Sequence, residues 1–326
     1  IKTITDQYEA YNLCPLGACE SYGTSWPVDR MYTADLLGFP NVWEIPQDVI
    51  SSRGFVQLGI LTGMRDICLV ASKLAQDLLL FTSYEYGMIG LGDEVAQRMH
   101  PITGSSVMAQ KKNPDALELV RATAPQLIGF TSIVSNILSG LPMGYNRDSR
   151  EVKEYIDLGL SKTLSMVGTL ASVIASLTVN KKRMMELVTA NYSMTTDVAD
   201  AISQKSGVGY RLVYKVVGQI VDEAIEHKQL LSDISAQDII KKASALGVDL
   251  DVTNAQLKEA MDPQKALGKR MHIGGSAKET MAISLARGQT LTNDVNKWVS
   301  TQKQMTSKAK SKTETIAQRI IQEKTL

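Results

Sequence analysis

Apolar residues recur at three- and four-residue steps along almost the whole chain, and this spacing constrains the fold more than any other feature. It matches the 3.6-residue turn of an α-helix, whereas the strict alternation typical of strands is rare. A short helix is predicted around Ile4 to Tyr11, a long one from about Gln47 to Thr82, and another from Glu151 to Leu177. The sequence therefore predicts an all-α protein.

The predicted helix 151–177 is narrow, because glycines such as Gly159 and Gly168 lie among its alanines and serines. Neighbouring helices can approach such a helix closely, which is typical of the inside of a bundle. Asp157, Lys162 and several hydroxyl groups interrupt its apolar run and argue against a membrane span. We interpret it as a buried helix of a helical bundle.

The chain changes character near residue 178, where shorter amphipathic helices begin. Breaks at Asn191, Gly207-Val208-Gly209, Gly247 and Pro263 separate them. We predict three parts: a central helical-bundle domain (1–178), a smaller helical domain (179–292) and a polar, Lys-rich tail or peripheral helix (293–326).

The charge and cysteine content restrict the partners that we expect. A net charge of +1 favours neither nucleic acid nor a membrane as the main partner. The three cysteines lack the spacing of metal ligands, so we expect no metal and interpret them as buried thiols of a reducing compartment. No signal-peptide pattern follows Ile1, which favours a cytoplasmic protein, and the helical pattern at Ile1 suggests a longer natural chain.

One segment, Gly104 to Asp115, combines a glycine, two adjacent serines and two adjacent lysines with the start of a predicted helix. Asn113, Pro114 and Asp115 fit the N-cap and first two positions of that helix. The lysines then lie just before the positive end of the helix dipole, next to free N–H groups. The segment therefore predicts an anion site, although taken alone a solvated surface loop is the commoner explanation.

A second cluster, Leu141 to Glu154, has a Gly-Tyr break followed by a helix that starts near Asp148. Arg150 and Lys153 are three residues apart and share a face of its first turns. Cations there oppose the helix dipole. They either bind an anion or form the i,i+4 ion pairs Arg150–Glu154 and Lys153–Asp157, and the residues alone leave both explanations open.

These segments resemble motifs of the argininosuccinate lyase branch of the fumarase/aspartase superfamily. Gly-Ser-Ser followed by Lys-Lys-Asn-Pro-Asp resembles its signature loop, with Ala109 at the usual proline. Tyr145-Asn-Arg-Asp through Lys153-Glu154 resembles a second motif, with Arg150 at a usual glutamine. Trp26 to Arg30, Gln47 to Arg53, and the glycine turns of the smaller domain resemble further segments in the same order. The resemblance implies a long-helix bundle with a small C-terminal helical domain.

The resemblance also implies a reaction, the elimination of argininosuccinate to arginine and fumarate, without a cofactor. It makes Ser105 the catalytic base, Lys111 the cation that stabilises developing charge, and Asn113 an amide donor. Tyr145 and Lys153 correspond to substrate-binding residues of the family. Arg150 can bind a carboxylate in bidentate fashion, and Arg30 either holds a carboxylate or pairs with Asp29 or Asp48.

The family resemblance implies a homotetramer whose active sites combine segments of three subunits. The family's general acid belongs to a Thr-His motif, and His100, His227 and His272 do not match it. We therefore expect this chain alone to be nearly inactive. Two alternatives stay open: another lyase of the superfamily, such as adenylosuccinate lyase or fumarase, and an inactive structural homologue like the lens crystallins.

Overall fold

The computed structural model describes residues 1–92 and 113–323 and divides into two compact units. The first unit comprises Ile1–Glu85, Ile89–Val179 and the chain from Lys297 onward. The second comprises Tyr86–Met88 and Asn180–Asn296. Helix α13 (Lys278–Glu323) contains the boundary between residues 296 and 297, so the polar C-terminal segment predicted as a tail or peripheral helix belongs to one 46-residue helix.

The first unit is built from helices and one two-residue strand pair, which agrees with the predicted all-α class. Its elements are α1 (Lys2–Tyr11), α2 (Arg30–Leu37), α3 (Pro46–Ser51), α4 (Phe55–Thr82), β1 (Ile89–Gly90), α5 (Asp115–Ser139), the 3-10 helix η1 (Arg147–Arg150), α6 (Val152–Ser176) and β2 (Thr178–Val179). The strands pair antiparallel, with Ile89 opposite Val179.

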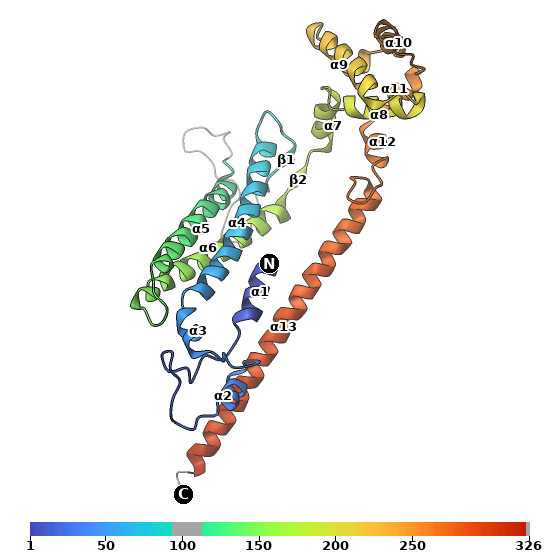
Figure 1. Ribbon diagram of the computed structural model, residues 1–326. Coiled ribbons are helices and arrows are strands. Elements are labelled where there is room, and N and C mark those ends of the chain that lie inside the picture. The colour runs from blue at the N-terminus through green and yellow to red at the C-terminus, as the bar shows by residue number, and fades with distance from the viewer. Residues whose placement is uncertain (93–112, 324–326) are drawn as a thin grey trace. The chain divides into compact units, whose positions relative to one another are not determined.

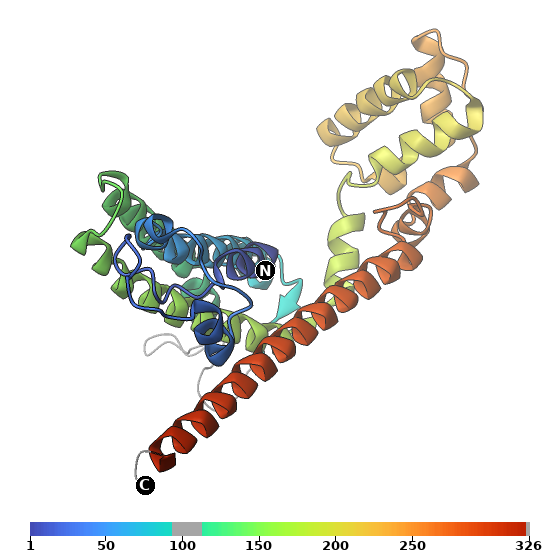
Figure 2. The same ribbon diagram turned by 60° about the horizontal axis from the view of Figure 1, so that its bottom comes forward.

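Helices α4, α5 and α6 run side by side and bury the core of this unit (Figure 1 and Figure 2). Leu61, Leu127 and Val134 are fully buried between them. Gly159 brings α6 close to α4, because a Cβ atom there would lie 2.6 Å from Leu61 Cδ2. Gly168 has no atom within 4 Å of such a position. The sequence predicted that neighbouring helices approach α6 closely at its small residues. Within this chain, such an approach is seen at Gly159.

The helix predicted from Gln47 to Thr82 is wrong in its first part, because α3 ends at Ser51 and α4 begins at Phe55. Gly54 causes the break. Its φ of +90° is one that residues with a Cβ atom rarely adopt, and an added Cβ would lie 2.5 Å from Leu138 Cδ2. The glycine thus turns the chain from α3 into α4 and lets α5 pack against the turn.

Helix α13 supports the first unit through its C-terminal half. Trp298 packs edge-on against the ring of Tyr8, with ring centroids 5.1 Å apart, and its Nε1 donates to Glu9 Oε1 at 2.9 Å. Farther along, Lys312 pairs with Asp35 and the Thr313 hydroxyl donates to Leu36 O. These contacts tie the C-terminal helix to α1 and α2.

The second unit is a small helical domain whose breaks follow the predicted glycines. Gly207 and Gly247 have φ of +71° and +72°, and each follows closely on a helix end. Val213, Val216 and Ile239 lie in its buried core. Besides the first part of α13, the elements are α7 (Lys181–Thr189), α8 (Thr195–Ser206), α9 (Tyr210–Glu226), the 3-10 helix η2 (Leu231–Asp233), α10 (Ala236–Ala245), α11 (Asn254–Ala260) and α12 (Pro263–Gly268).

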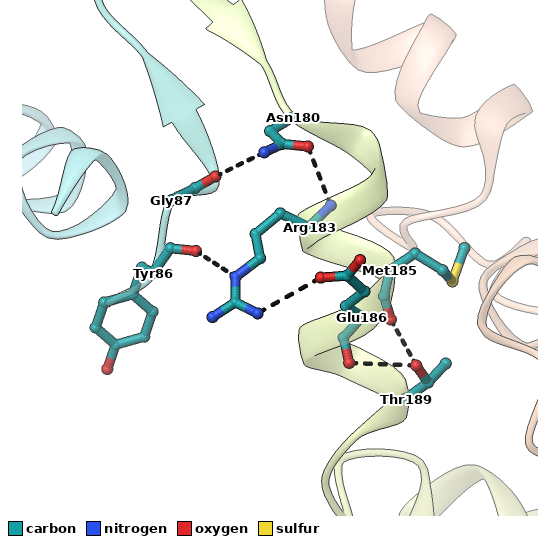
Figure 3. Close-up of polar contacts among 7 residues, drawn as sticks. All are labelled: Tyr86, Gly87, Asn180, Arg183, Met185, Glu186 and Thr189. Carbon is teal, nitrogen blue, oxygen red and sulfur yellow. Dashed lines mark hydrogen bonds and ion pairs between the residues drawn. The ribbon is translucent and has the colours of Figure 1, made fainter. Parts of the chain in front are cut away.

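Two separate stretches of chain meet at the start of α7 (Figure 3). Asn180 caps α7 by accepting from Arg183 N at 3.1 Å, and its side-chain amide donates to Gly87 O at 3.2 Å. Arg183 Nε donates to Tyr86 O at 3.0 Å. Residues 86–88 are thus held against α7 through their backbone carbonyls.

The prediction that all three cysteines are buried is wrong for Cys19. Cys14 and Cys68 are buried, but Cys19 is exposed in a loop where three consecutive residues have positive φ. Such φ values arise in a tight surface turn. The expectation rested on the frequency with which free cysteines are buried, which says nothing about turn geometry.

Two helical stretches, Phe55–Thr82 and Arg147–Ser176, are long and apolar enough to cross a membrane by length and composition alone. Only 28% and 33% of their most apolar windows are buried inside this chain. On α6 the side chains of Leu160 and Leu164 are exposed. Helix α6 therefore buries one face in the bundle, as interpreted from the sequence, whereas another apolar face has no cover among the described residues.

Replacing Gly54 by alanine should lower the free energy of unfolding by about 2–4 kcal/mol, because the substitution adds backbone strain and a steric clash with Leu138. Gly218→Ala in α9 is the control. An added Cβ there meets no atom within 4 Å, so it should raise the free energy of unfolding by about 0.5–1 kcal/mol. Urea denaturation of both variants measures the difference, and equal effects would contradict the assigned role of Gly54.

Candidate active site

The connection between α5 and α6 forms a tightly bonded turn that presents Tyr145. Gly144 has a φ of +109°, and its N–H donates to Ser51 Oγ at 2.9 Å. The Asn146 side-chain amide donates to Pro142 O at 2.7 Å and to Gly144 O at 3.1 Å. These bonds fix the backbone on both sides of Tyr145.

Tyr145 lies under the guanidinium group of Arg53. The Arg53 Cζ atom is 5.0 Å from the centroid of the tyrosine ring, within the range of a cation–π contact. Tyr145 as a residue is 48% exposed, so it is partly covered and partly open to solvent. The segment Gln47–Arg53 therefore meets the Tyr145 turn, although more than 90 residues separate Ser51 from Gly144.

Arg150 and Lys153 follow this turn at the start of α6, and both are exposed. Among the described residues, neither Arg150–Glu154 nor Lys153–Asp157 forms an ion pair. The sequence left open that these two cations form i,i+4 ion pairs, and the structure does not support that explanation. Two solvent-facing cations remain shortly after Tyr145 in the chain: Arg150 ends η1, and Lys153 lies in the first turn of α6, where the dipole disfavours a cation.

Arg30 makes contacts that the sequence did not predict. Its Nε donates to Leu16 O at 2.9 Å and its Nη2 donates to Trp43 O at 2.7 Å. It forms no ion pair with Asp29, whose carboxylate caps α2, or with Asp48, which accepts from Trp43 Nε1. The guanidinium group thus joins two loops through their carbonyl oxygens.

Within one copy of the chain, Asn113 lies far from the turn that carries Tyr145. It precedes Pro114, which is the N-cap of α5, one position later than the sequence predicted. Helix α5 has 25 residues and separates Asn113 from the Tyr145 turn by about 37 Å at 1.5 Å per residue. Ser105 and Lys111 lie outside the described residues. A single copy of the chain therefore does not bring Asn113 and Tyr145 together.

Three described groups have clearly shifted pKa values, and they lie outside these segments. Burial raises the pKa of the Cys68 thiol, an effect opposed by its contact with the Thr163 hydroxyl. Hydrogen bonds from Ser235 lower the pKa of Asp238, which caps α10. The side chain of Lys269 lowers the pKa of Glu259. Each shift has a local structural cause.

The roles of Ser51 and Arg53 in supporting Tyr145 were missed by sequence reasoning. The segment Gln47–Arg53 resembles a family motif, but this resemblance does not predict which residues the segment contacts. No local pattern indicates a contact across more than 90 residues, because it depends on how α4 and α5 pack.

The overall architecture matches solved lyases. An EDDS lyase in complex with formate superposes with a TM-score of 0.83 at 27% identity, covering 98% of this chain and 63% of that chain. A class II fumarase from Schistosoma mansoni shares the fold, with a TM-score of 0.61 at 16% identity, over 80% of this chain and 54% of that one. A family model described as "Lyase" matches residues 2–129. The fold and sequence together define a lyase of the fumarase/aspartase superfamily.

Relatives with a higher sequence identity are named argininosuccinate lyase. A family model described as "Argininosuccinate lyase C-terminal" matches residues 192–268. Argininosuccinate lyase 2 of Shouchella clausii is 34% identical over 292 residues, covering 88% of this chain and 59% of the relative. The argininosuccinate lyase of Methanocaldococcus jannaschii is 32% identical, covering 86% of this chain and 55% of the relative. The chain is thus similar to argininosuccinate lyases along most of its length, and it spans 55–59% of the length of these two relatives.

Removing the guanidinium group of Arg30 should destabilise the fold. We expect Arg30→Met to lower the free energy of unfolding by about 1–3 kcal/mol, since two carbonyl groups lose a charged donor. The exposed Arg287 on α13, also changed to methionine, is the control and should change stability little. Denaturant titration measures both. A normal stability of Arg30→Met together with weakened substrate binding would instead support the carboxylate-binding role.

Proposed function

We propose that the natural protein eliminates argininosuccinate to arginine and fumarate. The observation that carries this proposal is the match to argininosuccinate lyases along 282–292 residues, which includes both the Gly104–Asp115 segment and the Tyr145 turn. The two cations beside Tyr145 add support, since the substrate carries carboxylates and Arg150 and Lys153 have no anionic partner among the described residues.

In the proposed mechanism, Ser105 removes a proton from the carbon next to a carboxylate, and negative charge builds up on that carboxylate. Lys111 and the amide of Asn113 stabilise this charge, because a fixed cation and donor strengthen their interaction as the charge develops. The carbon–nitrogen bond then breaks, and the departing guanidinium nitrogen takes a proton from a general acid supplied by another segment. The hydroxyl of Ser105 needs activation by nearby cations and amides to act as a base.

Tyr145, Arg150 and Lys153 bind the substrate in this proposal. The rigid turn places the tyrosine hydroxyl, and the two cations attract the carboxylates. Arg30 is a further candidate for binding a carboxylate, but its hydrogen bonds to Leu16 O and Trp43 O already give it a role in holding two loops together.

A second candidate reaction is that of EDDS lyase. Its structure covers 98% of this chain, and a variant of it was solved with bound fumarate. Release of fumarate from argininosuccinate, compared with release from EDDS and from adenylosuccinate, distinguishes the candidates. An absence of fumarate release from all three substrates would favour the inactive, crystallin-like alternative.

We also propose that the protein is a homotetramer with shared active sites and works in the cytoplasm, like the soluble enzymes of its family. Two observations support the assembly. Asn113 and Tyr145 lie at opposite ends of α5, so one active site needs segments of different copies. The bundle helices also expose large apolar side chains, among them Val70 on α4, Leu119 on α5 and Leu164 on α6, as expected for an interface.

Replacing Leu164 by lysine should break this assembly, because the side chain is 64% exposed in the single chain and would bring a charge into the bundle interface. Light scattering during size-exclusion chromatography should give four chains for the natural protein and fewer for Leu164→Lys. Leu212→Lys on α9, also at an exposed leucine, should stay tetrameric. A monomeric natural protein would contradict the proposal.

Replacing Ser105 by alanine should reduce turnover of argininosuccinate by about 10²- to 10⁴-fold, since the general base is lost. Substrate binding, measured by calorimetry, should change little because the carboxylate-binding cations remain. Ser106→Ala is the matched control and should retain most of the turnover. Near-normal turnover by Ser105→Ala would reject the serine as the base.

A further inference from the structure

Arg53 is the charged side chain whose role the proposed mechanism leaves unexplained. It lies in the three-residue turn between α3 and α4 and is half-buried. Among the described residues its guanidinium group has no hydrogen bond or ion pair, in contrast to Arg65, which pairs with Asp66 at 2.8 Å. Its contact with the ring of Tyr145, at 5.0 Å, is therefore the main interaction of its charged group.

Both members of this pair are held by fixed backbone. On the arginine side, Gly54 makes the turn with its positive φ, and its N–H donates to Gln57 Oε1 at 3.0 Å. On the tyrosine side, Gly144 donates to Ser51 Oγ at 2.9 Å. Because Ser51 ends α3 and Arg53 follows two residues later, one short segment anchors the backbone next to Tyr145 and also covers its ring.

The surroundings leave the ring free to move if this cover is lost. Tyr145 is 48% exposed, so few packing contacts hold it. A cavity of about 100 Å³ also lies beside the turn, lined by Ser51, Arg53, Gly144 and Asn146 among others. The guanidinium face is thus the contact most able to restrict the orientation of the ring.

We propose that Arg53 is a positioning residue that orients Tyr145 toward the substrate. The substrate side of this inference rests on the proposed function, whereas the contact between the two residues does not. A planar guanidinium group stacks on an aromatic face in a way that a lysine ammonium does not, so the geometry favours arginine here. The positive charge above the ring also attracts an anionic substrate to the tyrosine hydroxyl.

The kinetic test compares Arg53→Met and Arg53→Lys with Arg65→Met in the natural protein, using argininosuccinate and detecting fumarate. Arg53→Met should raise KM about two- to fivefold, the size expected of one cation–π contact, with kcat changed less than about twofold. Arg53→Lys should recover part of the loss, and Arg65→Met should behave like the natural protein. In a Tyr145→Phe background Arg53→Met should add little, because the group that Arg53 positions is already missing. Full additivity would overturn the proposal.

A second measurement does not depend on activity. The natural protein carrying 3-fluorotyrosine at position 145 gives a fluorine NMR signal that reports the surroundings of this ring. Arg53→Met should shift and broaden the signal, and Arg65→Met should leave it unchanged. An unchanged signal in folded Arg53→Met, with folding checked by circular dichroism, would overturn the proposal. A shifted signal in a protein that releases no fumarate from argininosuccinate supports the positioning of Tyr145 and rejects the proposed substrate.

Discussion

The close contact of α4 with α5 and α6 is the constraint on which the first unit depends. Gly159 has no side chain, so Leu61 of α4 and Leu127 of α5 both reach the space next to it. An interior packed at this density does not tolerate an added methyl group without cost. This contact fixes the position of α5, and α5 in turn sets the distance between Asn113 at one end and the Tyr145 turn at the other.

The length of α5 explains why the predicted site residues do not meet within one chain. Asn113 precedes the helix and Tyr145 follows it, and a continuous helix of 25 residues does not bend back on itself. A site that uses both residues therefore has to be completed by another copy. The same three helices carry apolar side chains that their own chain leaves exposed. One architectural feature, a long helical bundle, thus accounts both for the separation of Asn113 from Tyr145 and for the apolar surface that the single chain exposes.

Local features of the sequence predicted most of the helices, whereas contacts between residues far apart in the chain could not be predicted from it. Gly207 and Gly247 mark helix ends, because glycine can adopt the positive φ needed there whatever its surroundings. Gly54 was missed, since apolar spacing continues across the break, and the Leu138 side chain that packs against this turn comes from another helix. Arg30 illustrates the same limit at the site. Its motif suggested a carboxylate ligand, but its partners are backbone carbonyls of loops at residues 16 and 43, which only the folded chain brings near.

The arrangement of charges at the start of α6 connects the fold to the chemistry. Lys153 lies in the first turn of α6, where the helix dipole disfavours a cation at a cost of about 0.3–1 kcal/mol, and neither it nor Arg150 at the end of η1 forms an ion pair with a described carboxylate. A bound dicarboxylate would supply the missing negative charge and would also interact favourably with the same helix N-terminus. Sites that bind charged ligands commonly keep such uncompensated groups, because the interaction that the free protein lacks is then made only with the ligand. The hydrogen-bonded turn at Gly144 would add to this effect, since it fixes the backbone next to Tyr145 before any ligand arrives and so reduces the entropy that binding has to overcome.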